Sequence, residues 1–281
     1  MKLELHCHTT CSDGRLTPEE LYQLAKKESL SYMALTDHDT VDGHFRMESS
    51  LTEGAFHYIP GIELTTSQNG ESIHILGYFN SDSYKDPEFL KILRDLHEAR
   101  NERIRKFIDN LKKHFDLTVD YDLMKKSNQG VLTRANLARE VHPLVPHLTY
   151  NEAFETYLDK KSPAYIPNIK LSVEDGIALL KKHGAKVVLA HPVIYKKNTL
   201  EELLLHDFDG LECYYFLNDD ALTEKSLKLA KEKNLLITAG SDYHGIPGDL
   251  KHGYLGSMNY KEEHLVPFLS WFQEGSLYKK K

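Results

Sequence analysis

Short strand-like runs alternate with helix signals along two stretches of this chain, and no other feature restricts its fold as strongly. Apolar runs, each the length of one strand, occupy residues 3–8, 31–38, 56–64, 72–79, 186–190, 211–215 and 235–239. Helix signals separate several of these runs. In Thr17-Pro18-Glu19-Glu20, for example, a capping residue precedes a proline at the first helical position and a glutamate at the third. Because such alternation builds a parallel sheet or a barrel, we predict an α/β fold.

The chain changes character after residue 79. A polar loop at 80–83 is followed by Asp86-Pro87-Glu88, which starts a long helix with apolar residues at spacings of three and four. These residues are Phe89, Leu93, Leu96, Ile104, Phe107, Ile108 and Leu111. We therefore predict a mostly helical insertion over 82–165, with 1–81 and 166–281 forming the α/β domain. Further helices are expected from Ser172 to His183 and over 220–233, and residues 254–270 are expected to contain a short strand and a helix.

Composition limits the partners and the compartment. The net charge of −7 offers no long-range attraction for duplex nucleic acid, although a cluster of Lys and Arg could still bind one phosphorylated end. The longest apolar stretches, such as 186–191, are far shorter than the roughly 20 residues of a membrane-spanning helix, so no membrane partner is expected. No basic and apolar leader precedes the first strand, and three cysteines cannot form a disulfide framework. We expect a cytoplasmic protein with reduced thiols.

Histidines stand near the ends of the expected strands. The chain has 16 of them, as many as its glycines. Side chains alternate along a strand, so His6 and His8 face one side while Cys7 faces the core. Similar positions in other strands are occupied by His38, His74 and His191. Each histidine alone could equally be a core residue with a hydrogen-bond partner, but together they favour a metal site, because each buried imidazole would otherwise need its own partner.

Carboxylates accompany these histidines. Asp13 follows the first strand, Glu63 is expected at the end of the third, and Asp242 precedes His244 after the last. Carboxylate oxygens mixed with imidazole nitrogens suit zinc, manganese or iron, and one carboxylate can bridge two ions. In parallel barrels, functional residues lie at the carboxyl ends of the strands, which is where we expect these side chains.

A series of short motifs containing these residues runs through most of the chain in a distinctive order. The motifs are His6-Cys7-His8, Ser12-Asp13-Gly14, Thr36-Asp37-His38-Asp39-Thr40, Gly61-Ile62-Glu63, His74, Ala190-His191-Pro192 and Gly240-Ser241-Asp242-Tyr243-His244-Gly245. In order and spacing they resemble the motifs of the PHP (polymerase and histidinol phosphatase) superfamily. The resemblance implies a distorted (β/α)7 barrel that holds a centre of three divalent metal ions, which could be manganese, iron or zinc.

The resemblance also implies a set of ligands. One ion would bind His6, His8, Glu63 and Asp242; a second would share Glu63 and add His74 and His191; the third would bind Asp13, His38 and His244. A hydroxide bridging the ions, held through Glu63 and its neighbouring ligands, would attack the phosphorus atom. Asp37 and Asp39 alternate out of phase with His38, so we assign them to supporting or capping roles.

Segments of the insertion resemble one subfamily, the small bacterial phosphoesterases that remove the 3′-phosphate of nucleoside 3′,5′-bisphosphates; some of these also trim the 5′ ends of short RNA. The segments are 132–138, 154–158 and 164–165. Arg134 is a candidate phosphate-binding residue, because a guanidinium group matches two phosphate oxygens. The subfamily commonly has Pro-His after this arginine, whereas Ala135-Asn136 follow here. Arg100 and Arg103 also resemble subfamily positions; any of the three arginines could equally be a solvated surface residue.

We therefore predict a metal-dependent hydrolase of phosphate monoesters whose substrate is a small nucleotide or the end of a short oligonucleotide. Two alternatives remain open from the sequence. A histidinol-phosphate phosphatase would share the metal motifs, and a non-catalytic accessory module, like the PHP domains attached to some bacterial polymerases, would share the fold. Amide hydrolysis in a similar barrel is a weaker possibility.

Overall fold

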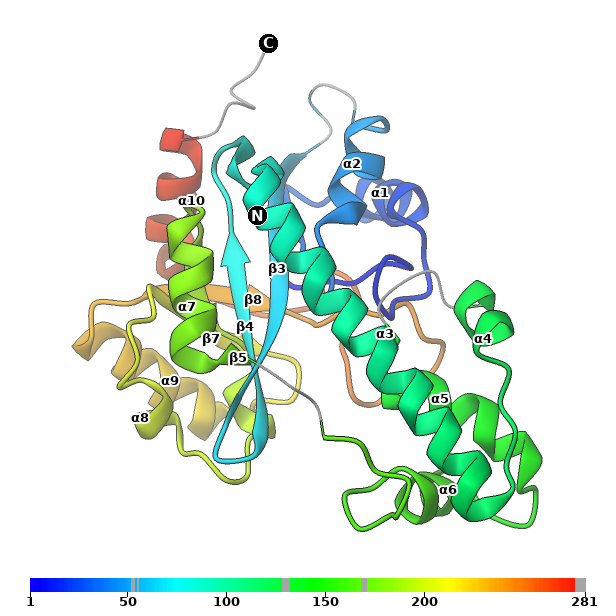
Figure 1. The fold of residues 1–281 in the computed structure, drawn as a ribbon. Coiled ribbons are helices and arrows are strands. Elements are labelled where there is room, and N and C mark those ends of the chain that lie inside the picture. The colour runs from blue at the N-terminus through cyan, green and yellow to red at the C-terminus, as the bar shows by residue number, and fades with distance from the viewer. Residues whose placement is uncertain (52–53, 55, 128–131, 168–170, 276–281) are drawn as a thin grey trace. The chain divides into compact units, whose positions relative to one another are not determined.

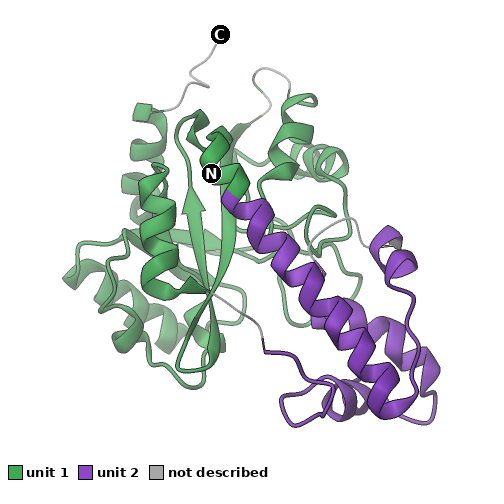
Figure 2. Ribbon diagram, viewed as in Figure 1, with its two compact units in different colours: residues 1–91, 170–281 green, residues 92–169 purple. Residues whose placement is uncertain are grey.

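The computed structural model describes residues 1–51, 54, 56–127, 132–167 and 171–275. By its internal contacts the chain forms two compact units, one of residues 1–91 with 170–281 and the other of residues 92–169 (Figure 2). The expected insertion, 82–165, covers most of the second unit.

The first unit contains a mixed sheet that curves into a nearly closed barrel (Figure 1). Its strands are β1 (Leu3–Glu4), β2 (Tyr32–Leu35), β3 (His57–Gln68), β4 (Glu71–Tyr78), β6 (Lys186–Leu189), β7 (Gly210–Tyr215) and β8 (Leu236–Gly240), in that order, and β5 (Leu171–Ser172) pairs with β3. Residues beyond β1 close the sheet against β8, where the amide of Leu5 donates to the carbonyl of Ala239 at 3.2 Å. The predicted distorted barrel is confirmed.

The strand direction differs from the expectation at β4, which pairs antiparallel with both β3 and β6. A tight turn produces this reversal: Asn69 and Gly70 both have positive φ, 50° and 70°, as a two-residue hairpin turn requires. Because β4 runs in the opposite direction, its amino-terminal half lies at the same end of the barrel as the carboxyl ends of the parallel strands. His74 belongs to this half of β4. The hairpin also extends β3 to Gln68, so Glu63 lies inside this strand and the prediction that it ends the strand was wrong.

Helices of the first unit pack against the sheet. They are α1 (Pro18–Lys27), α2 (Asp42–Glu48), α7 (Val173–Lys182), α8 (Leu200–Leu203), α9 (Asp220–Glu232) and α10 (Glu262–Gly275). The capping box predicted for α1 is present, since the Thr17 side chain accepts from the Glu20 amide and the Glu20 side chain accepts from the Thr17 amide. Ser172 caps α7 as predicted. Helix α9 contacts β7, and α10 contacts β8.

The short strand predicted within residues 254–270 was wrong. Residues 254–257 form a turn in which the Ser257 amide donates to the Tyr254 carbonyl at 3.0 Å, and Gly256 has a φ of +68°. The Gly256 amide donates to the buried Glu4 carboxylate at 2.9 Å instead of to a neighbouring strand. This segment therefore lies outside the sheet.

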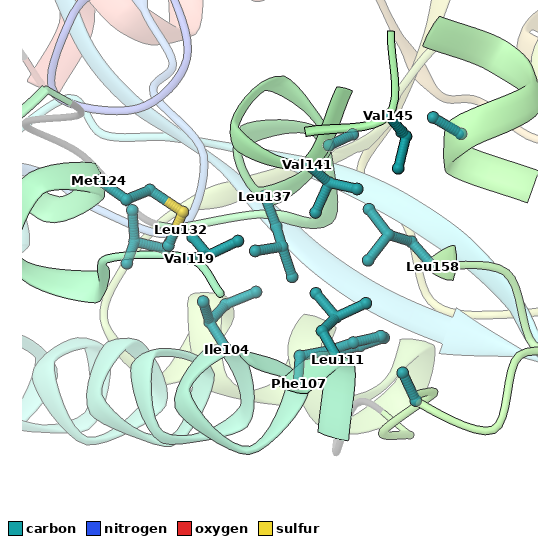
Figure 3. Packing of buried hydrophobic residues seen from close by; sticks show 13 residues of the cluster. Ile104, Phe107, Leu111, Val119, Met124, Leu132, Leu137, Val141, Val145 and Leu158 are labelled. Atoms are coloured by element: carbon teal, nitrogen blue, oxygen red, sulfur yellow. The ribbon is translucent and has the colours of Figure 1, made fainter. Parts of the chain in front are cut away.

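The described residues of the second unit are mostly helical. Most of α3 (Pro87–Phe115) belongs to it, with α4 (Tyr121–Ser127), α5 (Arg134–Val141) and α6 (Tyr150–Tyr157). The apolar face of α3 supplies Ile104, Phe107 and Leu111 to a buried cluster, in which they pack with Leu137 and Val141 of α5 (Figure 3). This unit thus has a hydrophobic core of its own.

Within the described ranges, no helix has both the length and the apolar character needed to cross a membrane. Cys7, Cys11 and Cys213 are free thiols, and Cys7 is fully buried with its Sγ–H donating to the Ala34 carbonyl at 3.1 Å. Cys7 is therefore a core residue, as predicted.

Candidate metal centre

His6 and His8 lie just beyond β1, in a segment that pairs with the chain following β8. The His8 amide donates to the Tyr243 carbonyl at 2.9 Å, and Cys7 between the two histidines forms a bridge with the same tyrosine. Both imidazoles are fully buried. The alternation predicted from the sequence thus places both rings on one side of the backbone, at the centre of the barrel end.

His38 and Glu63 are brought together by backbone pairing beyond β2. The two residues form an isolated parallel bridge, and the Asp39 amide donates to the Glu63 carbonyl at 3.0 Å. The carboxylate of Asp39 then accepts from the amide and hydroxyl of Thr65, each at 2.7 Å. Asp39 therefore fixes the edge of the site rather than entering it.

Asp37 holds the loop that carries Asp13. Its two oxygens accept from the amide and hydroxyl of Thr9, at 2.7 and 2.6 Å, and from the hydroxyl of Ser12 at 2.6 Å. The aspartate is buried and lies under the loop. These contacts agree with the supporting role that the sequence predicts for it.

Glu63 is the centre of the arrangement, since five imidazoles surround its carboxylate. Oε1 lies 2.8 Å from His191 Nε2 and 2.9 Å from His74 Nδ1. Oε2 lies 3.0 Å from a nitrogen of His38 and 3.2 Å from one of His6 and one of His8. A carboxylate with different donors around each oxygen has the form expected of a bridging ligand.

Two aspartates complete the cluster. Asp242 Oδ1 lies 3.0 Å from His8 Nε2 and 3.4 Å from His6 Nε2. Asp13 Oδ1 lies 3.2 Å from His244 Nε2, and its Oδ2 lies 3.8 Å from His38 Nε2. All the residues proposed as ligands from the sequence therefore converge at one end of the barrel.

Potential ligand atoms within 4.8 Å of one another form overlapping groups. The groups are His6, His8, Glu63 and Asp242; His8, Asp13, His38 and His244; His38, Glu63 and His74; and Asp242, His244 and His252. The first has the composition that the family resemblance implies for one ion. In the assignment implied by the resemblance, Glu63 is the one ligand shared by two ions. In the structure, His8 and His38 also each belong to two groups. It also adds His252, which we did not predict.

Many atoms of the cluster have no hydrogen bond. Among the described residues, buried polar atoms without a hydrogen-bond partner include His6 Nε2, His8 Nε2, Asp13 Oδ1, His38 Nδ1, Glu63 Oε2 and Asp242 Oδ1. A buried polar atom left unsatisfied costs about 1–3 kcal/mol, so such a concentration needs an explanation. Divalent cations between these atoms provide one, and the mixture of imidazole and carboxylate suits zinc, manganese or iron.

Electrostatics within the cluster keep its acids charged. Burial raises the pKa of Glu63, but His38, His6 and His74 together hold it well below its usual range. Burial lowers the pKa of His8, whereas close contact with the charged carboxylates of Asp242 and Glu63 raises it to about 10. Without a cation, protons on His6 and His8 therefore balance part of the carboxylate charge. A metal ion would replace those protons.

An outer layer of side chains orients the cluster. Glu212 is fully buried, with Oε1 3.0 Å from His6 Nδ1 and Oε2 accepting from the His191 amide at 2.8 Å. Tyr215 donates its hydroxyl hydrogen to Asp242 Oδ2 at 3.2 Å. A carboxylate behind a metal-binding histidine fixes the ring and its tautomer. The sequence analysis missed Glu212 and Tyr215, although an acidic residue inside the apolar run 211–215 was a signal that could have identified Glu212.

Two residues of the cluster have strained backbone conformations. His191 has a φ of 25° and Asp242 a φ of 58°, in the left-handed region that residues other than glycine rarely adopt. Both follow the ends of buried strands, β6 and β8. Strain of this kind persists where the surrounding structure determines the conformation, and it is common at functional sites.

The arginines proposed for phosphate binding lie in the second unit. Arg134 and Arg103 share one aromatic ring, since their guanidinium carbons lie 5.8 and 5.9 Å from the centre of Tyr165. Arg134 donates to the Leu158 carbonyl at 3.2 Å and Arg103 to the Ile166 carbonyl at 2.8 Å. Burial and the charges of Arg134 and Arg100 lower the pKa of Arg103 to about 10. These arginines are therefore clustered, not scattered over the surface of the helices.

Comparison with known proteins shows related chains of similar length. The family model described as PHP domain matches residues 4–138. A protein of Haemophilus influenzae named 5′-3′ exoribonuclease is 30% identical over 249 residues, which cover 86% of this chain and 90% of that protein. The 3′,5′-nucleoside bisphosphate phosphatase of Chromobacterium violaceum is 27% identical over 254 residues, which cover 88% of each chain.

Solved structures show the same fold. A candidate metal-dependent phosphoesterase from Bifidobacterium adolescentis has a TM-score of 0.77 at 26% identity, with 95% of both chains covered. An amidohydrolase from Chromobacterium violaceum has a TM-score of 0.79 at 23% identity, with 98% of this chain and 97% of that chain covered. The fold is thus shared over nearly the whole length of the chain.

Proposed function

Because this chain belongs to the PHP domain family and is a metal-dependent phosphoesterase, we propose that it removes the 3′-phosphate of nucleoside 3′,5′-bisphosphates. The observation that carries the proposal is the convergence of buried imidazole and carboxylate atoms that lack hydrogen bonds around Glu63. Relatives named as an exoribonuclease and as a nucleoside bisphosphate phosphatase support a nucleotide or an RNA end as the substrate.

Three divalent ions, of manganese, iron or zinc, are proposed for the centre. The donor groups support one ion among His6, His8, Glu63 and Asp242, one beside Glu63, His74 and His191, and one among Asp13, His38 and His244. Bound there, divalent cations would lower the pKa of water and neutralise charge on phosphoryl oxygens.

The chain's own residues prepare this chemistry by holding the donors in place. Glu63 keeps both oxygens directed at imidazoles, Glu212 holds the His6 ring from behind, and Tyr215 fixes Asp242. Because these contacts exist before substrate binds, little reorganisation is required at the reacting phosphate. Because the described imidazoles and carboxylates of the centre are proposed as metal ligands, we assign none of them the role of a covalent nucleophile.

The arginine cluster is proposed to bind the phosphate that is not cleaved. Among the described residues, neither Arg103 nor Arg134 pairs with a carboxylate, and both guanidinium groups lie on aromatic rings, including Phe107 for Arg103 and Phe154 for Arg134. Two cations held together without a described counterion favour an anion of more than one charge. In a nucleoside 3′,5′-bisphosphate, the phosphate that is not cleaved is such an anion.

A substrate panel tests the proposal. Purified protein loaded with Mn²⁺ is expected to release phosphate from adenosine 3′,5′-bisphosphate much faster than from histidinol phosphate. Faster release from histidinol phosphate would favour that alternative activity, and bound metal without turnover of any phosphoester would favour an accessory module. Mononucleotide release from a 5′-phosphorylated short RNA would show exoribonuclease activity.

Arg134 can be tested against a neighbour on the same helix. Arg134→Ala is expected to raise the KM for the bisphosphate by about 10- to 100-fold, the equivalent of about 1.5–3 kcal/mol for a charged hydrogen bond. Hydrolysis of a phosphate monoester with no second phosphate should be unaffected. The control, Arg139→Ala, removes an exposed arginine of α5. Equal effects of the two substitutions would contradict the assignment.

A further inference from the structure

His252 contacts two of the proposed ligands from a segment that the sequence analysis did not consider. It lies in the loop between β8 and α10, and its ring stacks on that of His244 with centres 4.2 Å apart and planes 28° apart. Its Nε2 lies 3.8 Å from Asp242 Oδ2. Its side chain is 23% exposed, so it stands at the border between the buried cluster and solvent.

The backbone beside His252 is fixed to the barrel. The Gly253 amide donates to the Ser241 carbonyl at 2.7 Å. A Cβ atom at position 253 would lie 2.9 Å from both Phe216 Cδ2 and Ser241 Cβ, so only glycine fits this close approach. The neighbouring imidazole is therefore held at a defined place beside the centre.

Asp249 fixes the orientation of the ring. Its Oδ2 lies 2.7 Å from His252 Nδ1, and since a carboxylate can only accept, Nδ1 carries the hydrogen. The neutral ring then has its free electron pair on Nε2, the atom that faces Asp242. A carboxylate behind the remote nitrogen is the usual arrangement for a histidine that binds metal.

The facing atoms are spaced for a shared cation. An electron pair on Nε2 and a carboxylate oxygen have no hydrogen between them, and 3.8 Å exceeds hydrogen-bond range. Two ligand atoms that each lie about 2.1 Å from one ion can be separated by such a distance. Asp242, His244 and His252 also form one of the groups with donor atoms within 4.8 Å of one another.

We infer that His252 is an additional nitrogen ligand, which binds a cation together with Asp242. The inference rests on the metal centre proposed above and adds to it a donor outside the set implied by the family resemblance. Asp249 acts as a positioning residue, because it reaches the centre only through the His252 ring.

Cobalt(II) provides a test that does not depend on turnover. Metal-free protein is titrated with Co²⁺, and the visible ligand-field spectrum and the affinity of each site are recorded for wild type, His252→Ala and Asp249→Ala. The matched control is His147→Ala, which removes an exposed imidazole of the second unit. Thermal unfolding of each metal-free variant establishes that it is folded.

We expect His252→Ala to change the cobalt spectrum and to weaken one site by about 10- to 100-fold, and added imidazole to restore the spectrum. Asp249→Ala should weaken the same site less, and His147→Ala should match wild type. A wild-type spectrum and affinity in His252→Ala would overturn the inference while leaving the proposed centre intact, as would a changed spectrum that imidazole does not restore. A wild-type protein that binds no cobalt would overturn both.

Discussion

Replacing Glu212 with glutamine should weaken metal binding although the residue is not among the proposed ligands. Its two oxygens each face one N–H group: that of His6 Nδ1 at 3.0 Å and that of the His191 backbone at 2.8 Å. Glutamine has one oxygen and one NH2 group. In either orientation of the amide, therefore, one N–H donor would face another.

The size of the effect follows from this mismatch. Leaving one buried donor unsatisfied costs about 1–3 kcal/mol, and loss of a carboxylate behind a metal-binding histidine typically costs about 10- to 100-fold in metal affinity, which is about 1.4–2.7 kcal/mol. The two estimates agree. Because the mismatch displaces either the His6 ring or the His191 backbone, the loss should concern ions bound by those histidines.

Competition with a chromophoric chelator measures this effect. Glu212→Gln is compared with Glu224→Gln, which removes an exposed carboxylate from α9. We expect a loss of affinity for Mn²⁺ or Zn²⁺ in the first variant alone, with both variants folded. Equal affinities for Glu212→Gln and wild type would refute the reasoning that an outer carboxylate holds the cluster.

Four further predictions follow from the structure. Gly240→Ala should abolish metal binding, because the new Cβ would lie 2.3 Å from His6 Cβ and 2.6 Å from Glu212 Oε1; metal retained at wild-type affinity would contradict this. Burial lowers the pKa of His44 from 6.5 to about 4, so the folded protein holds this ring in its neutral form. The stability that the neutral His44 contributes is fully present above pH 6.5 and is lost as the pH falls towards 4. His44→Gln should therefore remove about 3 kcal/mol of the pH dependence of unfolding in this range, and an unchanged slope would argue against a neutral, buried His44. Metal uptake near pH 7 should release protons, since the pKa of metal-free His8 is raised to about 10; calorimetry in buffers of different ionisation enthalpy would detect this, and zero release would count against the charge state assigned to the cluster. Phe107→Ala should cost about 3–5 kcal/mol in denaturant unfolding because this ring is fully buried in the core of the second unit, and a loss below about 1 kcal/mol would contradict that packing.

Local patterns in the sequence predicted the α/β alternation and the histidines and carboxylates near the strand ends, whereas the distorted barrel and the grouping of the ligands were implied by the family resemblance. The alternation of side chains along a strand places His6 and His8 on the same side. The motifs identify Glu63 and Asp242 even where the length or direction of a strand was predicted wrongly. The reversal at Asn69-Gly70 was missed because residues 56–64 and 72–79 were treated as separate strands of a parallel sheet, although this dipeptide is a hairpin signal.

Other parts of the site depend on contacts between distant segments. Glu212 reaches His6 across 206 positions of sequence, and Glu4 accepts from Gly256 across 252. His252 lies in a loop whose path is set by Ser241 and Phe216, and no periodic pattern marks it. Such residues have no local signature, so they could be recognised only once the chain was folded.

Metal content measured together with activity tests the central claim most directly. Purified protein is analysed for metals, stripped with a chelator, assayed for phosphate release from adenosine 3′,5′-bisphosphate, and assayed again after divalent ions are restored. Three ions per chain, loss of turnover on stripping and recovery on reloading are the predicted results. A single ion per chain would contradict the three-ion centre, and substantial turnover by the stripped protein would contradict a metal-dependent reaction.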